Sequence, residues 1–326
     1  MLIVILSVIL INLIIIKYFN QITKYINLFD HPDDNRKIHT KKIALLGGSI
    51  VFVNLSLYYL LSPFLINDME IDYSLWVFSF FIFILGLLDD KYKINSNLKF
   101  FLFIIFSYLL LKIDNNLIIS QLNFSFLENN ISLGKFSLFF SILALIIFLN
   151  AFNMFDGINL QSSIYAIFIF SVFILNNFYI ELSTIIIFSL SFFIYLNYKN
   201  ISFLGDNGSL LIAFLISYIF FQSSSKEIFY ADEILLIMLI PGLDLIRLFF
   251  TRLMQAKSPF TPDDNHFHHH LLKKFGLIKA NLIVFLLISI PYTLASITNQ
   301  FLLLIVIVLF IYFFMLWYLK KNIYEI

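Results

Sequence analysis

Long apolar runs, separated by short polar segments, repeat along the whole chain. Each run comes close to the roughly 20 apolar residues that a helix needs to cross the ~30 Å hydrocarbon core of a membrane. The pattern predicts an all-α, polytopic integral membrane protein, with the stretch 116–128 as a short interfacial segment. About eleven transmembrane helices are expected, near 1–19, 43–62, 74–88, 98–112, 135–153, 162–177, 179–196, 208–222, 234–253, 280–297 and 300–319.

Composition supports this interpretation. Hydrophobic residues make up 61% of the chain and charged residues 13%, against about 25% charged in soluble proteins. The first run is followed by further spans, so it is expected to be a helix and not a signal peptide. The absence of cysteine excludes disulfides, thiolate metal sites and cysteine nucleophiles. A net charge of +1 argues against a nucleic-acid partner.

Basic residues divide unevenly between the two sides that eleven spans would create. Of the 21 lysines and arginines, only Lys112, Lys135 and Lys226 fall on one side. By the positive-inside rule the other side is cytoplasmic, which places the N-terminus outside and the C-terminus inside. The unusual polar segments all fall on the cytoplasmic side, where we expect the active site.

The least membrane-like of these segments is SPFTPDDNHFHHHLL, residues 258–272. It contains His266, His268, His269 and His270, and imidazoles at this density can bind phosphate oxygens or a metal, or simply be solvated. No C-x-x-C or H-E-x-x-H frame is present, which disfavours a dedicated zinc site.

Two neighbouring acids, Asp89 and Asp90, end a strongly apolar run. Placing a carboxylate within the membrane costs free energy, so such a residue is by default taken to mark a functional site. Adjacent carboxylates also repel each other, so a cation is expected between them, either a metal ion or a lysine such as Lys91 or Lys99.

Asn150, Asn153 and Asp156 follow at three-residue spacing, which puts them on one face of a helix. Polar side chains on an apolar helix must face a cavity or partners. In the later segment FLGDNGS, Asp206 lies between two glycines. Glycines let backbone N–H groups turn toward an anion, as a helix N-terminus also does, although an ordinary turn stays open.

Two further segments are basic. The first loop carries Arg36, Lys37 and His39 and is either a phosphate clamp or a cluster that attracts anionic lipid. Asp244 and Arg247, three residues apart, are expected to pair. Carboxylates, basic groups and imidazoles on one side suit phosphoryl transfer on a polyanion, and oxygen ligands without thiolates point to Mg²⁺ or Mn²⁺.

In this order, NAFNMFDG, FLGDNGS and SPFTPD followed by the histidines resemble the polyprenyl-phosphate N-acetylhexosamine-1-phosphate transferases. The likeness spans about residues 30–275, is greatest to the WecA and TagO branch, and extends to MraY. It implies a single domain over 1–326, with extra C-terminal helices at 280–319. It also implies that a sugar 1-phosphate, most simply that of N-acetylglucosamine, moves from a UDP-amino sugar to undecaprenyl phosphate with release of UMP. This would be the first membrane step of a cell-surface polysaccharide pathway, such as cell-wall or O-antigen synthesis, in a bacterial inner membrane.

The resemblance also implies roles for individual residues. Asp89, Asp90 and Asp156 would be catalytic, and Asp206 would bind the magnesium. Substrate binding would fall to Arg36, Lys37, His39, Asn153, Phe203, His266, His268 and His269.

Several alternatives stay open. UDP-MurNAc-pentapeptide would need a wider site, whereas UDP-N-acetylfucosamine or UDP-N-acetylquinovosamine differs by few contacts. Asn159 stands where the family has a second acid, which leaves room for an inactive scaffold. A transporter is the alternative from another class, although it would spread its polar groups across the bilayer. The oligomeric state, a homodimer included, is open too.

Overall fold

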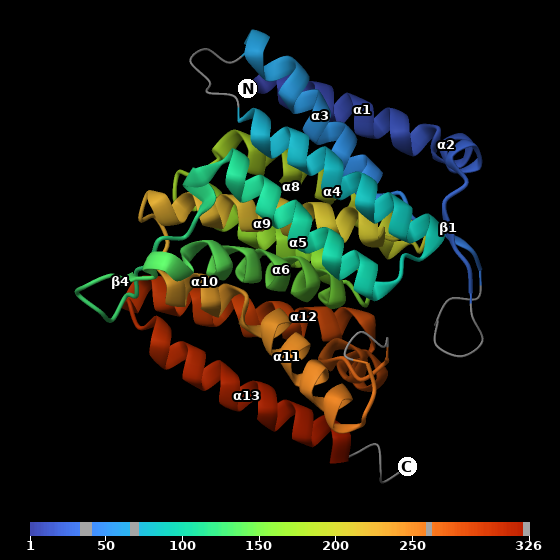
Figure 1. Cartoon of the computed structure of the whole chain (residues 1–326). Coiled ribbons are helices and arrows are strands. Elements are labelled where there is room, and N and C mark those ends of the chain that lie inside the picture. Colours follow the sequence, from blue (N-terminus) through green and yellow to red (C-terminus); the bar gives the residue numbers. More distant parts are fainter. Residues whose placement is uncertain (33–40, 66–71, 259–262, 322–326) are drawn as a thin grey trace. The chain divides into compact units, whose positions relative to one another are not determined.

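The computed structural model describes residues 1–32, 41–65, 72–258 and 263–321 (Figure 1). The chain forms two compact units, one of residues 1–102 and 162–218 and the other of residues 103–161 and 219–326. Helices dominate both units. In the first unit lie α1 (Leu2–Lys17), α2 (Phe19–Ile26), α3 (Gly47–Leu65), α4 (Tyr73–Tyr92), α7 (Gln161–Leu175) and α8 (Ile180–Tyr198). The second unit holds α6 (Ser137–Phe155), α10 (Ala231–Ile237), α11 (Leu239–Met254), α12 (Phe267–Thr298) and α13 (Phe301–Lys321). The helices α5 (Ser96–Ile113) and α9 (Gly205–Ser225) contribute residues to both.

In the first unit, α3 packs against α1, α4 and α8. Asn12 of α1 and Asn54 of α3 are buried and exchange two hydrogen bonds of 3.0 Å between their side-chain amides. Each amide nitrogen also donates to the carbonyl four residues earlier in its own helix. Such a pair fixes the rotation of two apolar helices against each other, since an unpaired amide in hydrocarbon is costly.

In the second unit, α11 packs against α6, and α12 packs against α13 and α10. The long helix α12 bends at Gly276, whose φ of +76° lies in the left-handed region that glycine adopts readily. Its first two turns therefore run separately from the apolar remainder. These turns hold His268, His269 and His270, and His266 lies immediately before them.

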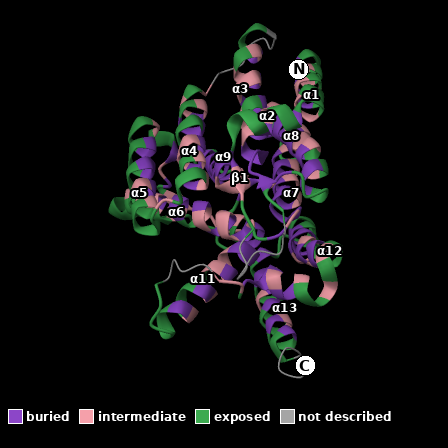
Figure 2. Ribbon diagram, turned by 90° about the vertical axis from the view of Figure 1, so that its right-hand side faces the viewer, coloured by how far each residue is buried: buried purple, intermediate pink, exposed green. Residues whose placement is uncertain are grey.

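Helix α9 is the most buried span. In its apolar window 89% of the residues are buried, against 28–50% for the other unbroken spans, and Figure 2 shows it mostly in the colour of buried residues. A helix that is apolar on all sides is stable only inside a protein or a membrane. The first turn of α9, which carries Asp206, is accordingly held by protein on several sides.

The expected class, a polytopic all-α membrane protein, is confirmed. In the described part of the chain, eight helices are long and apolar enough to cross a membrane, or up to ten if each bent pair counts as one span. The pairs α1 with α2 and α10 with α11 bend by 75° and 73°. At 15 residues α7 would reach only about 22 Å, so the predicted number of eleven is not confirmed.

Three local features of the structure were not predicted. The stretch 116–128 includes part of a short 3-10 turn (Asn115–Leu117) and a strand, β3 (Gln121–Leu122), that pairs with β4 (Ile131–Ser132). Helix α2 was not predicted, because its eight residues are amphipathic and form no apolar run. Helix α12 begins at Phe267, well before the expected start at 280, because its first turns are polar and hydropathy does not reveal them.

Candidate active site

The end of α4 and the start of α5 bring a lysine to the aspartate pair. Asp89 and Asp90 lie in the last turn of α4, and a short connection leads to Lys99 in the first turn of α5. The Nζ of Lys99 donates to Oδ2 of Asp89 at 2.5 Å, and the backbone N–H of Ile94 donates to the other oxygen at 2.9 Å. The lysine expected beside the pair is therefore Lys99.

Lys99 also binds a carboxylate from elsewhere in the sequence. Its Nζ lies 2.9 Å from Oδ2 of Asp206, in the first turn of α9. The side chain of Asp206 is 35% exposed, whereas that of Asp89 is 9% exposed. We call Asp89, Asp90, Lys99 and Asp206 the acid cluster; within it Asp206 is the more accessible of the two acids that share the lysine.

Asp90 has a different environment from its neighbour. Its carboxylate accepts hydrogen bonds from the backbone N–H groups of Asp206 (2.9 Å) and Asn207 (3.0 Å), and from the side-chain amide of Asn207. The sequence left open either an anion site at the backbone amides near Asp206 or an ordinary turn, and the structure shows two of these amides bound to the carboxylate of Asp90. A carboxylate at a helix N-terminus is favourable, so Asp90 fixes the start of α9.

This arrangement requires close backbone contact between helices. A Cβ atom on Gly86 of α4 would lie 2.4 Å from Cα of Asn207 and 2.6 Å from the carbonyl oxygen of Asp206. On Gly48 of α3 it would lie 2.3 Å from the backbone nitrogen of Gly208. Glycines on α3 and α4 thus allow the start of α9 to approach the aspartate pair.

The donor set of the acid cluster suits a hard cation. Three carboxylates face a single ammonium group among these four side chains, which leaves an excess of negative charge at their ordinary ionisation. Oxygen ligands are those that Mg²⁺ prefers. Asp206 is the residue best placed to hold such an ion, because its side chain is the accessible one, and Asp89 is its nearest acidic partner through Lys99.

Phe203 lies three residues before Asp206 and is half-buried. Its backbone N–H donates to the carbonyl of Ala44 (2.8 Å), and its carbonyl accepts from Gly47 (3.1 Å). Ala44 belongs to β2 (Ile43–Ala44), which pairs with β1 (Phe29–Asp30). Stacking of Phe203 on a base stays a prediction.

The first-loop residues Arg36, Lys37 and His39 lie outside the described residues. The described flanks of that loop are the paired strands β1 and β2, and Ala44 also forms a bridge to Ser202. The two ends of the loop are thus held together next to the segment that leads into Asp206.

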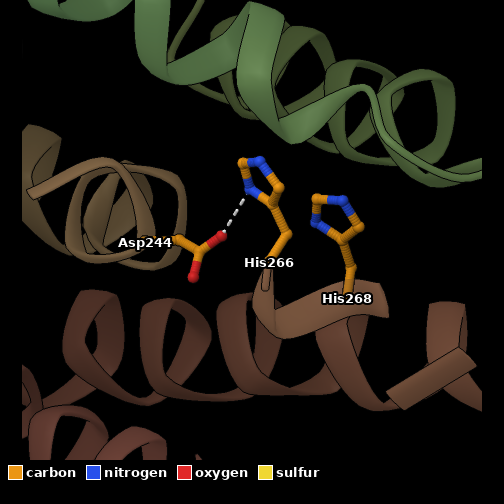
Figure 3. Close-up of side chains that lie close together, drawn as sticks. All are labelled: Asp244, His266 and His268. Carbon is orange, nitrogen blue, oxygen red and sulfur yellow. Dashed lines mark hydrogen bonds and ion pairs between the residues drawn. The ribbon is translucent and has the colours of Figure 1, made fainter. Parts of the chain in front are cut away.

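The histidines gather in the second unit. His266 precedes the first residue of α12, and its Nδ1 lies 2.9 Å from Oδ2 of Asp244 in α11 (Figure 3). The rings of His266 and His268 stack with centroids 5.1 Å apart, and those of His268 and His269 lie 4.5 Å apart. We call Asp244, His266, His268 and His269 the histidine cluster.

The predicted pair of Asp244 and Arg247 is confirmed, at 2.6 Å between Oδ1 and Nη2. Its contacts with His266 and with Tyr312 of α13 were not predicted. A tyrosine in an apolar run such as 301–321 gives no sequence signal of this role. A search of the sequence for an acid that orients a histidine would not have found Asp244. It lies 22 residues before His266, and this spacing fits no short motif.

Two arginines of α11 anchor the segment just before the histidines. Arg247 donates to the carbonyl of Asn265 at 2.5 Å, and Nε of Arg252 donates to Asp263 at 2.8 Å. Burial is the largest single influence and disfavours the charged form of Asp263, but the bonds from Arg252 and from the backbone N–H of Asn265, together with nearby positive charge, outweigh it and hold the pKa of Asp263 below its usual range. Asp263 therefore stays ionised and the segment stays fixed at neutral pH.

The same unit contains the end of α6, where Asn153 lies in the last turn and Asp156 follows it; both are half-buried. The ring of Phe155 meets the ring of His268 edge-on at 6.2 Å. His268 is buried, and its Nε2 has no hydrogen-bond partner among the described residues. A buried polar atom without a partner is unusual in a native structure, so this nitrogen is a candidate for contact with a bound water or ligand.

Gly157, which follows the end of α6, lies against the imidazole of His268. A Cβ atom at this position would lie 1.9 Å from Nε2 of His268. We expect Gly157→Ala to displace the buried imidazole, lowering the unfolding free energy by about 1–3 kcal/mol, as overpacking does, and lowering turnover with it. Thermal unfolding in detergent measures the first effect, and release of UMP, the product that the resemblance implies, measures the second.

The matched control is the double variant Gly157→Ala with His268→Ala, which removes the clash. It should regain most of the lost melting temperature. A double variant as unstable as Gly157→Ala would contradict this contact as the cause.

The structure thus forms two groups of predicted residues. Asp89, Asp90 and Asp206 meet in the first unit, where Phe203 also lies. Asn153, Asp156 and the histidines lie in the second. That the two groups face a common substrate stays a prediction.

Comparison with known proteins identifies the relatives of this chain. Residues 73–224 match the model of glycosyl transferase family 4. This match contains the whole acid cluster, and it confirms the resemblance that the motifs indicated.

Individual relatives match over a longer range. A Bacillus subtilis (strain 168) protein named "Probable undecaprenyl-phosphate N-acetylglucosaminyl 1-phosphate transferase" is 25% identical over 295 residues, which cover 87% of this chain and 81% of that protein. An undecaprenyl-phosphate alpha-N-acetylglucosaminyl 1-phosphate transferase of Escherichia coli O157:H7 is 26% identical over 280 residues, covering 82% and 75%. Its counterpart from Yersinia pestis is 28% identical over 264 residues, covering 76% and 70%.

Proposed function

We propose that the protein transfers N-acetylglucosamine 1-phosphate from UDP-N-acetylglucosamine to undecaprenyl phosphate. The observation that carries this proposal is the similarity to transferases of that name over at least 76% of the chain. An oxygen of the lipid phosphate attacks the phosphorus linked to the sugar. The bond from that phosphorus to the bridging oxygen breaks, and UMP leaves with the electron pair.

The barrier to this reaction lies mainly in bringing two polyanions together, because a phosphate monoester is already largely ionised near pH 7. Positioning and charge stabilisation are therefore the main tasks of the protein. In our proposal, Lys99 supplies a fixed positive charge between Asp89 and Asp206. Asp90 keeps the first turn of α9 in place, and Asp89 orients the acceptor phosphate.

Mg²⁺ belongs to this proposal as the cofactor. Asp206 would hold it, with Asp89 nearby, and the bound ion would neutralise charge on the diphosphate. The histidine cluster and Asn153 would bind the nucleotide sugar. These assignments are supported by the excess of carboxylates in the acid cluster and by the buried Nε2 of His268, which has no hydrogen-bond partner in the described part of the chain.

The test uses purified protein in detergent with undecaprenyl phosphate and Mg²⁺. UDP-GlcNAc, UDP-GalNAc and UDP-MurNAc-pentapeptide are offered separately, and UMP release is followed with Asp206→Ala as control. UMP from UDP-GlcNAc alone, abolished by EDTA and in the control, is the expected result. UMP release from another donor would move the assignment to that sugar. If no donor releases UMP, Asn159→Asp should be tested and should restore activity.

The same material tests direct attack. Rapid mixing of enzyme and donor without acceptor should release no UMP. A burst of UMP equal to the enzyme concentration would instead require a covalent aspartyl intermediate.

We also propose that the acid and histidine clusters face the cytoplasm, in keeping with the distribution of basic residues. The absence of cysteine from the chain makes a direct test simple. In intact cells, a membrane-impermeant maleimide should label Lys226→Cys and should label Lys199→Cys only after permeabilisation. The opposite pattern would invert the orientation.

A further inference from the structure

Asp244 is the most extensively hydrogen-bonded side chain of the histidine cluster. The carboxylate is buried, with 5% of the residue exposed. One oxygen lies 2.9 Å from Nδ1 of His266, and the other accepts from Arg247 (2.6 Å) and from the hydroxyl of Tyr312 (2.8 Å). The backbone N–H of Phe267 adds a further contact at 3.2 Å. Both oxygens are thus engaged by donors.

This pattern argues against a metal ion at the same place. Asp244, His266 and His268 each offer a potential ligand atom, and these atoms lie within 4.8 Å of one another. A metal would, however, have to displace His266 from one oxygen, or Arg247 and Tyr312 from the other, because donors already engage both oxygens of this carboxylate. A carboxylate with both oxygens occupied by donors is better explained as a hydrogen-bond acceptor.

The bond to Asp244 sets the chemistry of His266. A ring nitrogen that faces a carboxylate carries the proton, so Nδ1 of His266 is the protonated nitrogen. Nε2 then becomes the atom that can meet a ligand, and Figure 3 shows it on the side of the ring away from the carboxylate. When Nε2 carries a proton as well, it can donate a hydrogen bond to a phosphate oxygen.

Asp244 is itself held from two other directions. Tyr312 belongs to α13, is fully buried, and also accepts a bond from Nε of Arg247 at 3.2 Å. Arg247 reaches on to the carbonyl of Asn265, immediately before His266. Helices α11 and α13 therefore converge on His266, the residue immediately before α12.

We propose that Asp244, held by Arg247 and Tyr312, is a positioning residue that fixes the ring of His266, with Nδ1 protonated, for contact with a phosphate of the nucleotide sugar. The inference rests on the proposed function for the identity of the ligand. It assigns to α13 a part in the reaction, although α13 lies well outside the matched region 73–224.

The first readout needs no substrate. Protein labelled with ¹⁵N in its histidines shows which ring nitrogen carries the proton, and His266→Gln identifies the signals of His266 among the six histidines. In the unaltered protein the Nδ1 of His266 should be protonated. In Asp244→Asn the proton should move largely to Nε2, the usual preference of a free imidazole.

Kinetics provide the second readout. Asp244→Asn should lower kcat about tenfold to hundredfold, as loss of an outer partner of a functional histidine does, with a smaller change in KM for undecaprenyl phosphate. Tyr312→Phe should lower kcat a few-fold and shift the His266 signals. Tyr318→Phe is the matched control on the same helix, since phenylalanine keeps the ring that lies beneath Lys274. It should change neither readout.

The outcomes separate the two proposals. A protonated Nδ1 that is unaffected by Asp244→Asn would overturn the positioning role, whatever the activity. If Asp244→Asn fails to fold, unchanged His266 signals in Tyr312→Phe would overturn it equally. Stoichiometric binding of Zn²⁺ that shifts His266 and His268 together would replace it with a metal site. Tautomers as expected in a protein that releases no UMP would instead disprove the proposed function.

Discussion

Asp206→Asn is expected to lower turnover about 10²- to 10³-fold, the range seen when one preorganised charge-stabilising group is removed, while the protein stays folded. The two roles of this residue are carried by different atoms. Its backbone N–H binds Asp90, and that bond does not depend on the side chain. Its carboxylate contacts Lys99 and is the proposed metal ligand. Asparagine keeps the size and the backbone but removes the charge.

Two measurements check this prediction. UMP release gives turnover, and a Mg²⁺ titration of the melting temperature gives binding without catalysis. A ligand that binds only the folded state adds about 2.7 kcal/mol at a hundred times its Kd, so the unaltered protein should be stabilised and Asp206→Asn should not. Asp114→Asn, at an acid that pairs with Gln222 in the second unit, should behave like the unaltered protein. An active, magnesium-responsive Asp206→Asn would refute the assignment.

Gly86→Ala is expected to disrupt the acid cluster from a distance. The added methyl group would meet Cα of Asn207 at 2.4 Å, a backbone atom that no rotamer change can move. The first turn of α9 must then shift away from α4, which lengthens the bonds from Asp206 and Asn207 to Asp90. We expect a loss of about 1–3 kcal/mol in stability and a loss of turnover of about a hundredfold or more.

Gly242→Ala is the matched control for this substitution. Gly242 is also helical, but a Cβ atom there would meet nothing within 4 Å. Alanine should therefore be neutral or stabilise the helix by up to about 1 kcal/mol. Normal turnover and melting temperature in Gly86→Ala would mean that α4 and α9 do not approach as closely as the structure indicates.

Hydropathy predicted the helical class, because helices that cross a bilayer appear in a sequence as repeated long apolar runs. It could not predict where spans break. The bend between α10 and α11 at Met238 lies inside one apolar run and changes nothing in composition. The polar first turns of α12 are helical because tertiary contacts, including Asp244 at Phe267, hold them there.

The candidate site residues could be predicted where a charged or polar residue interrupts an apolar run. Asp89, Asp90 and Asp206 stood out for that reason, and Lys99 was one of two lysines within reach. The division of labour between Asp89 and Asp90 was hidden, because adjacent residues of a helix point in different directions and only the fold shows what each direction contains. The role of Tyr312 was still harder to predict from the sequence, since a tyrosine is compatible with a lipid-facing helix.

The paired amides of Asn12 and Asn54 have a consequence for the order of synthesis. Asn54 follows Asn12 by 42 residues, so α1 leaves the ribosome before its partner exists. Until α3 is inserted, Asn12 lacks the amide partner that Asn54 supplies, and this pair cannot yet fix the rotation of α1. The arrival of α3 supplies that partner, so the first helix of the chain acquires its final orientation only when the third has been made.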